Sequence, residues 1–275
     1  MKVIEFHGGL GNQLFEYVYL MYLKKQFPSE QFYTYINCNR LNLHNGFELS
    51  KWFDIDLPPT TKSITALCVL LFNTNRILRK LRLPLIGVSD DVHLNDMKLL
   101  HEGWYQNKRY FKEVGAPTFR KDLVLGKDNE ELLHKIKSCN SVSIHIRRGD
   151  FLSPINSKAM GGICTPKYYE KAMIKIKELV PNPVFFFFSD DPEYVNKTYD
   201  DLEKYVVTCN QGERSFFDIY LMSHCQNMIL ANSTFSCWAA YLNNKAQNII
   251  CPPIWNRNEM PDLSLENWIV IDGAY

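Results

Sequence analysis

The residues best suited to chemistry in this 275-residue sequence lie in the hexapeptide HIRRGD at residues 145–150. It closes the run 141–146, in which apolar and polar residues alternate, so we expect a β-strand that places His145 and Arg147 on one face. Open α/β sheets bind their ligands at the carboxyl ends of strands. The guanidinium groups of Arg147 and Arg148 match the oxygens of a pyrophosphate, and the glycine beside them lets backbone approach. A surface ion pair between arginine and aspartate is the alternative interpretation.

A glycine-rich turn, GGLGNQ at residues 8–13, follows an expected strand at about residues 3–6 and precedes a helix. It lacks the third glycine of a dinucleotide fingerprint, so nicotinamide binding is disfavoured. The start of a helix offers free amide groups, and Asn12 and Gln13 add side-chain donors. These groups suit hydroxyl-rich ligands such as sugars, whereas a plain tight turn is the alternative.

Adjacent carboxylates at Asp190 and Asp191 end the apolar run 184–188, at the same edge of the predicted sheet. Paired aspartates could hold a divalent metal ion. Because Asp191 precedes a proline, as a helix N-cap often does, we favour capping or pairing with arginine over metal binding. Residues 215–218 (SFFD) resemble a capping box, which would give Asp218 a structural role.

The segment 232–236 (NSTFS) follows a predicted strand at about 228–231 and opens a helix. Backbone amides, hydroxyl groups and the positive end of the helix dipole meet there, and together they suit a phosphate group. Ordinary capping of the helix by Ser233 explains the same residues equally well.

Strands and helices alternate in the second half of the chain, which predicts an α/β fold with a parallel, Rossmann-like lobe at residues 141–255. Residues 1–140 are expected to form an N-terminal lobe, and residues 256–275 a segment that returns to either lobe. Hydrophobic residues make up 46% of the chain and its net charge is +1. This balance is typical of an enzyme with a large core and excludes the basic surface of a nucleic-acid binder.

The eight cysteines show no metal-binding or redox spacing and no signal peptide precedes the first strand, so we expect a cytoplasmic protein with reduced thiols. The stretch 64–72 is almost wholly apolar but too short to cross a bilayer, and four basic residues follow it before residue 83. We favour a helix packed on the core of the N-terminal lobe. Weak peripheral association with an anionic membrane is the alternative.

Four motifs, in this order, resemble those of glycosyltransferase family 11, the α-1,2-fucosyltransferases: GGLGNQ (8–13), HIRRGD (145–150), FSDD (188–191) and NSTFSCWAAYL (232–242). The last motif is especially specific in combination with the second. The resemblance implies a GT-B-like fold of two lobes, with the donor on the C-terminal, Rossmann-like lobe and the acceptor on the side of the N-terminal lobe. It also implies a bacterial enzyme that uses GDP-fucose as donor substrate, without an essential metal or other cofactor.

The same resemblance assigns roles to individual residues. Arg147 would hold the β-phosphate with His145 beside the nucleotide, and Asp218 would accept hydrogen bonds from guanine. The other donor-binding residues that it implies are Arg148, Asp190, Asn232, Ser233, Thr234, Phe235 and Ser236. On the side of the sugar or acceptor it implies Gly9, Gly11, Asn12 and Gln13.

The expected reaction moves L-fucose, with inversion, from GDP-β-L-fucose to the 2-hydroxyl of a terminal galactose, as in lactose. Arg147 can neutralise the departing GDP where other enzymes use a metal cation. Asp150 is a candidate catalytic base, although we favour its pairing with Arg148, and His7 and Glu16 are weaker candidates. The alternatives are a fucosyltransferase of other regiochemistry (α-1,6 or O-fucosyl type), a non-catalytic nucleotide- or glycan-binding relative, and a nicotinamide oxidoreductase.

Overall fold

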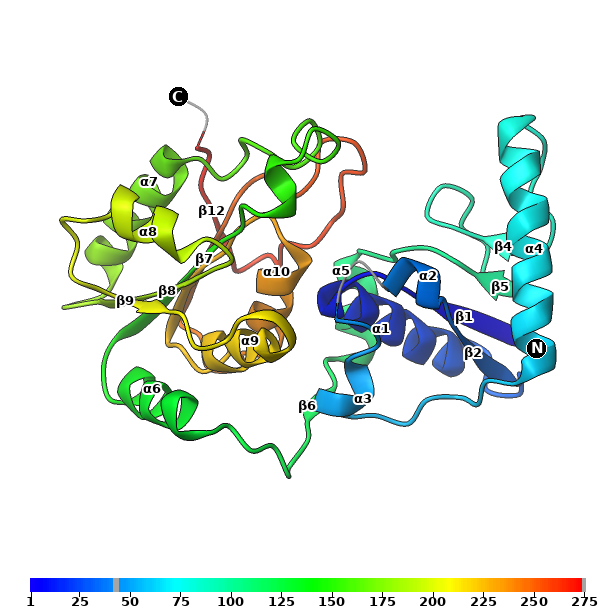
Figure 1. Cartoon of the computed structure of the whole chain (residues 1–275), viewed down its shortest axis with the longest axis horizontal. Helices are drawn as coiled ribbons and strands as arrows, with labels where there is room; N and C mark the ends of the chain where they lie inside the picture. The colour runs from blue at the N-terminus through cyan, green and yellow to red at the C-terminus, as the bar shows by residue number, and fades with distance from the viewer. Residues whose placement is uncertain (42–44, 274–275) are drawn as a thin grey trace. The chain divides into compact units, whose positions relative to one another are not determined.

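The computed structural model describes residues 1–41 and 45–273, and the chain forms two compact α/β units that divide after residue 121 (Figure 1). The division precedes the expected boundary at residue 140, because helix α6 (Lys127–Lys137) packs against a helix of the second unit. Of the expected C-terminal segment, residues 274–275 lie outside the described residues. Within the described ranges, no helix is both long enough and apolar enough to cross a membrane.

A four-stranded parallel sheet, in the order β2-β1-β5-β4, forms the centre of the first unit. Its strands are β1 (Lys2–Phe6), β2 (Phe32–Ile36), β4 (Val88–Ser89) and β5 (Leu100–His101). Its helices are α1 (Leu10–Gln26), α2 (Cys38–Leu41), α3 (Leu49–Trp52), α4 (Lys62–Lys80) and α5 (Lys108–Val114). A separate antiparallel pair joins β3 (Phe53–Asp54) to β6 (Thr118–Phe119). Strands β4 and β5 are too short to show an alternating pattern, and the sequence did not predict them.

Helix α4 packs on the sheet of the first unit through one row of side chains. Thr61 caps its start, since its Oγ1 accepts the N–H of Ile64 at 3.2 Å. Ile64 and Cys68 are buried against Val3 of β1 and Tyr35 of β2. The prediction that this stretch forms a helix packed on the N-terminal core is confirmed.

Six parallel strands, in the order β12-β11-β10-β7-β8-β9, form the sheet of the second unit. They are β7 (Ser141–Ile146), β8 (Val184–Ser189), β9 (Lys204–Val207), β10 (Asn227–Ile229), β11 (Asn248–Cys251) and β12 (Ile269–Val270). The connections contain α7 (Pro166–Leu179), α8 (Pro192–Thr198), α9 (Phe216–Met222), α10 (Thr234–Tyr241) and the 3-10 turns η1 (Asp150–Leu152) and η2 (Gly212–Arg214). The predicted parallel, Rossmann-like architecture is confirmed, and β12 returns the end of the chain to this sheet.

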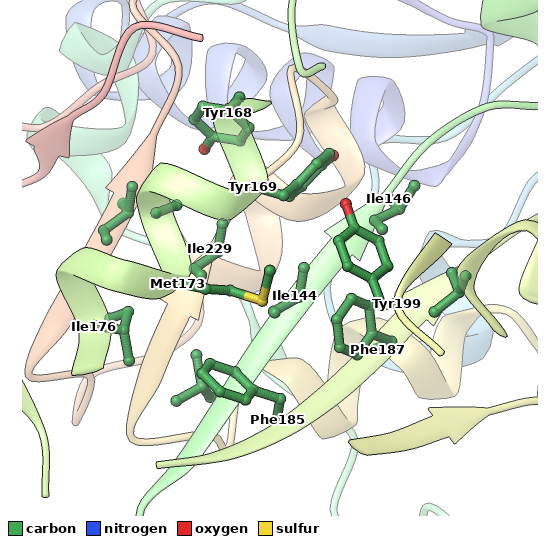
Figure 2. Close-up of a cluster of buried hydrophobic side chains, with 14 of the residues drawn as sticks. Ile144, Ile146, Tyr168, Tyr169, Met173, Ile176, Phe185, Phe187, Tyr199 and Ile229 are labelled. Carbon is green, nitrogen blue, oxygen red and sulfur yellow. The ribbon is translucent and has the colours of Figure 1, made fainter. Parts of the chain in front are cut away.

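The alternation along β7 sends its side chains to two different layers, of which Figure 2 shows the one that contains Ile144 and Ile146. Ile144 and Ile146 pack against Tyr169 and Met173 of α7 on one face of the sheet. His145 points to the opposite face, where its ring meets α10. The hydroxyl of Tyr169 donates to the carbonyl of His145 at 2.9 Å, so the same helix also fixes the end of the strand.

The strand order of the second sheet reverses at β7. From β7 the chain builds β8 and β9 on one side, and then crosses back to place β10 on the other. Crossovers that leave in opposite directions open a crevice at the carboxyl ends of the two central strands, where open α/β sheets bind ligands. Residues 147–150 follow β7 and residues 230–234 follow β10. The topology therefore brings two of the sequence motifs to one edge of one sheet.

Candidate functional site

Arg147 lies between two carboxylates just beyond the end of β7. Its Nη2 and Nε lie 2.7 and 3.0 Å from Oδ1 of Asp150, and its Nη1 lies 3.0 Å from Oδ2 of Asp190. Gly149 makes this approach possible, because a Cβ at that position would lie 2.8 Å from Oδ2 of Asp190. The two carboxylates hold the guanidinium group in one orientation at the carboxyl edge of the sheet, while 32% of the side chain stays open to solvent.

Arg148 has a different partner. Its Nε donates to Oδ2 of Asp191 at 2.9 Å, and its guanidinium group lies 3.6 Å from the centre of the Tyr194 ring. Asp191 also caps α8. The hydrogen bond from the N–H of Tyr194 lowers the pKa of this carboxyl most, and the hydrogen bond from Arg148 lowers it further. The expected pairing of Asp150 with Arg148 is therefore wrong, because Asp150 already binds Arg147 and Arg148 turns towards α8. The capping and arginine-pairing roles predicted for the aspartates after β8 are confirmed.

Neither aspartate after β8 belongs to a metal-like cluster. Within the part of the chain that the structure describes, no three histidine, cysteine, aspartate or glutamate side chains gather as metal ligands would. Asp190 and Asp191 each contact an arginine instead.

His145 is a buried, neutral group next to Arg147. Its ring stacks on Phe235 of α10, with ring centres 5.4 Å apart, and no described residue hydrogen-bonds its Nδ1. Burial first, and the charge of Arg147 second, lower the pKa of His145 to about 3. The imidazole is therefore neutral near neutral pH, and its Nδ1 is a buried polar atom next to Arg147.

The segment 232–236 divides into residues that support the backbone and residues at the free end of α10. Asn232 donates to two loop carbonyls at 3.0 and 3.2 Å, and the buried Ser236 donates to the carbonyl of Ala231 at 3.0 Å. Ser233 caps the helix by accepting the N–H of Phe235 at 3.3 Å. Ser233, Thr234 and Phe235 therefore form the helix start that a phosphate could meet.

Asp218 lies on α9, which packs against α10. Its Oδ1 accepts from Nδ2 of Asn210 at 2.9 Å, and Asn210 is fixed by two reciprocal amide bonds with the buried Asn129 at 2.8 and 3.0 Å. Burial raises the pKa of Asp218 to about 7, against a smaller lowering by Asn210. The predicted capping box is wrong, since a 3-10 turn runs straight into α9, Ser215 is itself helical, and its side chain makes no cap bond.

The glycine-rich turn of the first unit follows β1, the strand on which the first sheet also changes direction. Gly8 has φ +70°, and a Cβ there would lie 2.9 Å from the ring of Trp104. Gly9 is the N-cap of α1, and Gly11 is buried in its first turn. Asn12 accepts a hydrogen bond from a glutamine side chain of the loop before α5 at 3.0 Å.

Gln13 holds this turn together instead of offering free donors. Its Nε2 donates to the carbonyls of Gly8 and Gly46, and its Oε1 accepts the N–H of Glu48, each at 2.9 Å. The side chain is fully buried. Both Nε2 hydrogens of Gln13, which the sequence suggested for a sugar, are thus used within the chain, whereas the contact of Asn12 engages its acceptor oxygen.

Replacing Gln13 by leucine is expected to lower the free energy of unfolding by about 2–4 kcal/mol, because three backbone groups would lose their buried partner. Urea titration followed by circular dichroism measures this loss. Asn12→Ala, one residue away and only half-buried, is the matched control and should cost less than about 1 kcal/mol. Equal losses for the two variants would contradict the structural role of Gln13.

His7 and Glu16 form a closed pair at the end of β1. Nδ1 of His7 lies 2.9 Å from Oε1 of Glu16, and Oε2 accepts the His7 N–H at 3.0 Å. Trp104 covers the imidazole with ring centres 4.2 Å apart, and Arg40 lies over the same indole. Burial lowers the pKa of His7 to about 2 and raises that of Glu16. Trp104 and Arg40 were missed in the sequence, because neither belongs to a motif or to a recognisable element.

The family model of Glycosyl transferase family 11 matches residues 93–272, more than half of the chain. The chain is 30% identical to the O-antigen biosynthesis glycosyltransferase WbnK of Escherichia coli, over 95% of this chain and 97% of the relative. It is 31% identical to the α-1,2-colitosyltransferase of Escherichia coli, over 96% and 97%. It is also 29% identical to the galactoside 2-α-L-fucosyltransferase Sec1 of Mus musculus, over 37% of this chain and 28% of that protein.

The NodZ α-1,6-fucosyltransferase, solved after soaking with GDP-fucose, has a similar fold, with a TM-score of 0.53 at 13% identity over 90% of this chain and 92% of that chain. The fold is thus GT-B-like, with two α/β units that each contain a parallel sheet. The similarity in sequence to two bacterial glycosyltransferases extends over nearly the whole chain. From the family match and these relatives, we conclude that the chain is a glycosyltransferase and belongs to glycosyltransferase family 11.

Proposed function

We propose that this enzyme transfers L-fucose, with inversion, from GDP-β-L-fucose to the 2-hydroxyl of a terminal galactose. The observation that carries the proposal is the clamped Arg147 at the point where the strand order reverses, next to the motif that opens α10. A guanidinium fork and the positive end of a helix dipole both favour a pyrophosphate. The α-1,2-fucosyl and α-1,2-colitosyl relatives support the sugar class and the linkage.

We assign recognition of the guanine base to Asp218. Guanine presents two adjacent donors, its ring N–H and its 2-amino group, and a carboxylate has two acceptor oxygens for them. Uracil presents one N–H between two carbonyl oxygens, which a carboxylate repels. The Asn129–Asn210 pair supports this assignment. Asn129 fixes Asn210, and the side-chain amide of Asn210 donates to Oδ1 of Asp218 and so orients the carboxylate.

Donor binding is expected to weaken about tenfold per pH unit as the pH falls below 7, because the pKa of Asp218 is raised to about 7 and its protonated form cannot accept both bonds. For the fold the sign is opposite. Between the ordinary carboxyl pKa and about 7 the folded chain keeps a proton that the unfolded chain releases, so this group stabilises the fold less as the pH rises through that window. Calorimetric titration with GDP at several pH values measures this change in affinity. UDP is the control, because its phosphates titrate in the same pH range as those of GDP. Equal pH slopes for GDP and UDP would contradict it.

The chemical step needs compensation of the charge on the leaving group. As the acceptor oxygen attacks the anomeric carbon, the bond from that carbon to the β-phosphate oxygen breaks, and its electron pair leaves with GDP. We propose that Arg147 and the start of α10 stabilise this charge, so that no metal ion is required. Asp150, 44% exposed beside Arg147, is our candidate to receive the acceptor proton, whereas His7 is covered by Trp104.

The natural acceptor we propose is a galactose-terminated oligosaccharide of a bacterial surface polysaccharide, which the O-antigen relative supports. We place the reaction in the cytoplasm, and the eight cysteines support this compartment because all of them are free thiols.

Colitosyl transfer is a second candidate, favoured by the 31% identical relative. Colitose and fucose differ by one hydroxyl group, and the residues assigned to GDP would serve either sugar. Comparing kcat/KM for the two GDP-sugars on one acceptor separates the candidates, since a site that hydrogen-bonds the extra hydroxyl discriminates strongly against a sugar that lacks it.

The experiment that tests the proposal measures GDP release from GDP-fucose and lactose, with and without EDTA, and determines the linkage of the product. Turnover that EDTA leaves unchanged, with an α-1,2-linked product, supports donor, linkage and metal independence together. Tight GDP binding without turnover would keep the donor and change the acceptor. A protein that shows no turnover and does not bind GDP would overturn the proposal.

A further inference from the structure

Helix α4 carries apolar side chains on two opposite sides. One row is buried against the sheet, as described above. A second row, at positions 66, 70, 77 and 81, follows helical spacing on the other side and faces solvent. In this row Leu70 is 63%, Ile77 58% and Leu81 62% exposed. Figure 1 shows the last turns of α4 running past the edge of the sheet, so the core of the unit does not need this outer row.

The same segment is strongly basic. Residues 57–89 contain no aspartate or glutamate, but they contain Lys62, Arg76, Arg79, Lys80 and Arg82. Arg79 is neutralised by Asp90 and Glu102. The spacing of 14 and 18 residues from Lys62 puts Arg76 and Lys80 on one flank of the helix, beside the outer row. Exposed apolar and cationic side chains therefore lie next to each other.

Two contacts attach neighbouring segments with exposed apolar side chains to the inner side of α4, where Asn75 is buried. Asn75 binds the backbone of Ile86 through two hydrogen bonds of 2.8 and 3.0 Å, and Ile86 is itself 57% exposed. The Arg79–Asp90 pair ties the helix to the loop at 90–98, which exposes Val92 and Met97. The outer face of α4 therefore consists of its second apolar row and the basic flank beside it.

We propose that this outer face of α4 binds the surface of an anionic lipid bilayer. An apolar row inserts at the headgroup boundary, while the long basic side chains on its flank reach the lipid phosphates. A symmetric contact with a second copy fits this face less well, because it would bring the same cations together and residues 57–89 hold no carboxylate to pair them. The proposal does not depend on the proposed function, since it involves none of the residues assigned to the donor.

The test measures flotation of the purified full chain with vesicles of phosphatidylglycerol and with vesicles of phosphatidylcholine, at low and high salt. We expect binding to phosphatidylglycerol alone, and salt should weaken it. The variants Leu70→Gln/Ile77→Gln and Arg76→Gln/Lys80→Gln should each lower the partition coefficient on the order of tenfold or more. Substitutions at exposed positions of the second unit, Val124→Gln/Ile174→Gln, form the matched control and should leave it unchanged.

Three results would overturn the proposal: no binding of the wild-type chain to phosphatidylglycerol, equal binding of all variants, or a wild-type dimer that Leu70→Gln/Ile77→Gln makes monomeric. The last result would assign the face to a second copy. Circular dichroism shows whether each variant is folded, and both α4 variants should keep the GDP-fucose turnover of the wild type on a water-soluble acceptor. That turnover assay tests the proposed function separately, so each of the two proposals can fail without affecting the test of the other.

Discussion

Arg147→Ala is expected to lower kcat by about two to three orders of magnitude while the protein stays folded. One charge-assisted hydrogen bond contributes roughly 1.5–3 kcal/mol, so a bidentate arginine acting mainly in the transition state supplies about 3–5 kcal/mol. The fold should lose little, because the two ion pairs of Arg147 are partly exposed and such pairs contribute only about 0.2–1 kcal/mol each. Steady-state kinetics with GDP-fucose, together with thermal unfolding, measure both effects.

Arg148→Ala is the matched control for this prediction. It removes the same charge one residue along the chain, but Arg148 is engaged with Asp191 and Tyr194. The family resemblance placed Arg148 among the donor-binding residues, but these contacts occupy its guanidinium group, so we expect the effect on kcat to stay within about tenfold. Near-normal turnover of Arg147→Ala, or equal losses for the two variants, would remove Arg147 from the chemical step. Arg147→Lys should recover only part of the rate, because an ammonium group cannot form the fork.

The sequence predicted the elements whose patterns are local. The strands at 141–146 and 184–188, the helix capped by Asp191 and the helix start at Ser233 were all expected, because alternation, proline and capping residues act over a few positions. The same local signals brought two motifs to one sheet edge. The local patterns could not predict the order of the strands in the sheet, and this order makes the ends of β7 and β10 neighbours.

The sequence was least reliable for polar side chains whose partners lie far along the chain. Gln13 resembled a ligand donor, yet it binds backbone more than 30 residues away. Asn232 likewise supports loops distant in sequence. The roles of Arg147 and Arg148 could not be distinguished either, because the conformation of the turn at Gly149 decides which of the two Asp150 contacts. Burial and long-range packing, which no spacing encodes, select between a binding role and a structural role.

Asp218→Asn is expected to weaken GDP binding by about two to three orders of magnitude without weakening UDP binding, because the carboxylate repels uracil. Asparagine keeps the shape of the side chain but replaces one acceptor oxygen by a donor, which then faces a donor of the guanine. Two charge-assisted bonds are lost, and each contributes roughly 1.5–3 kcal/mol. The variant should fold, because Asp218 takes no part in capping α9 and its remaining oxygen can still accept from Asn210.

Inosine diphosphate makes this prediction sharper, because it lacks the 2-amino group of guanine and keeps the ring N–H. Wild-type protein should bind it about tenfold or more weakly than GDP, whereas Asp218→Asn should bind the two nucleotides almost equally. The variant should also lose the pH dependence of GDP binding, since that dependence comes from a carboxyl whose pKa is raised to about 7. A variant that still prefers GDP over inosine diphosphate and keeps the pH slope would place guanine recognition elsewhere. Loss of the preference together with loss of the slope would trace both to one carboxylate, because no other change to the protein accompanies this substitution.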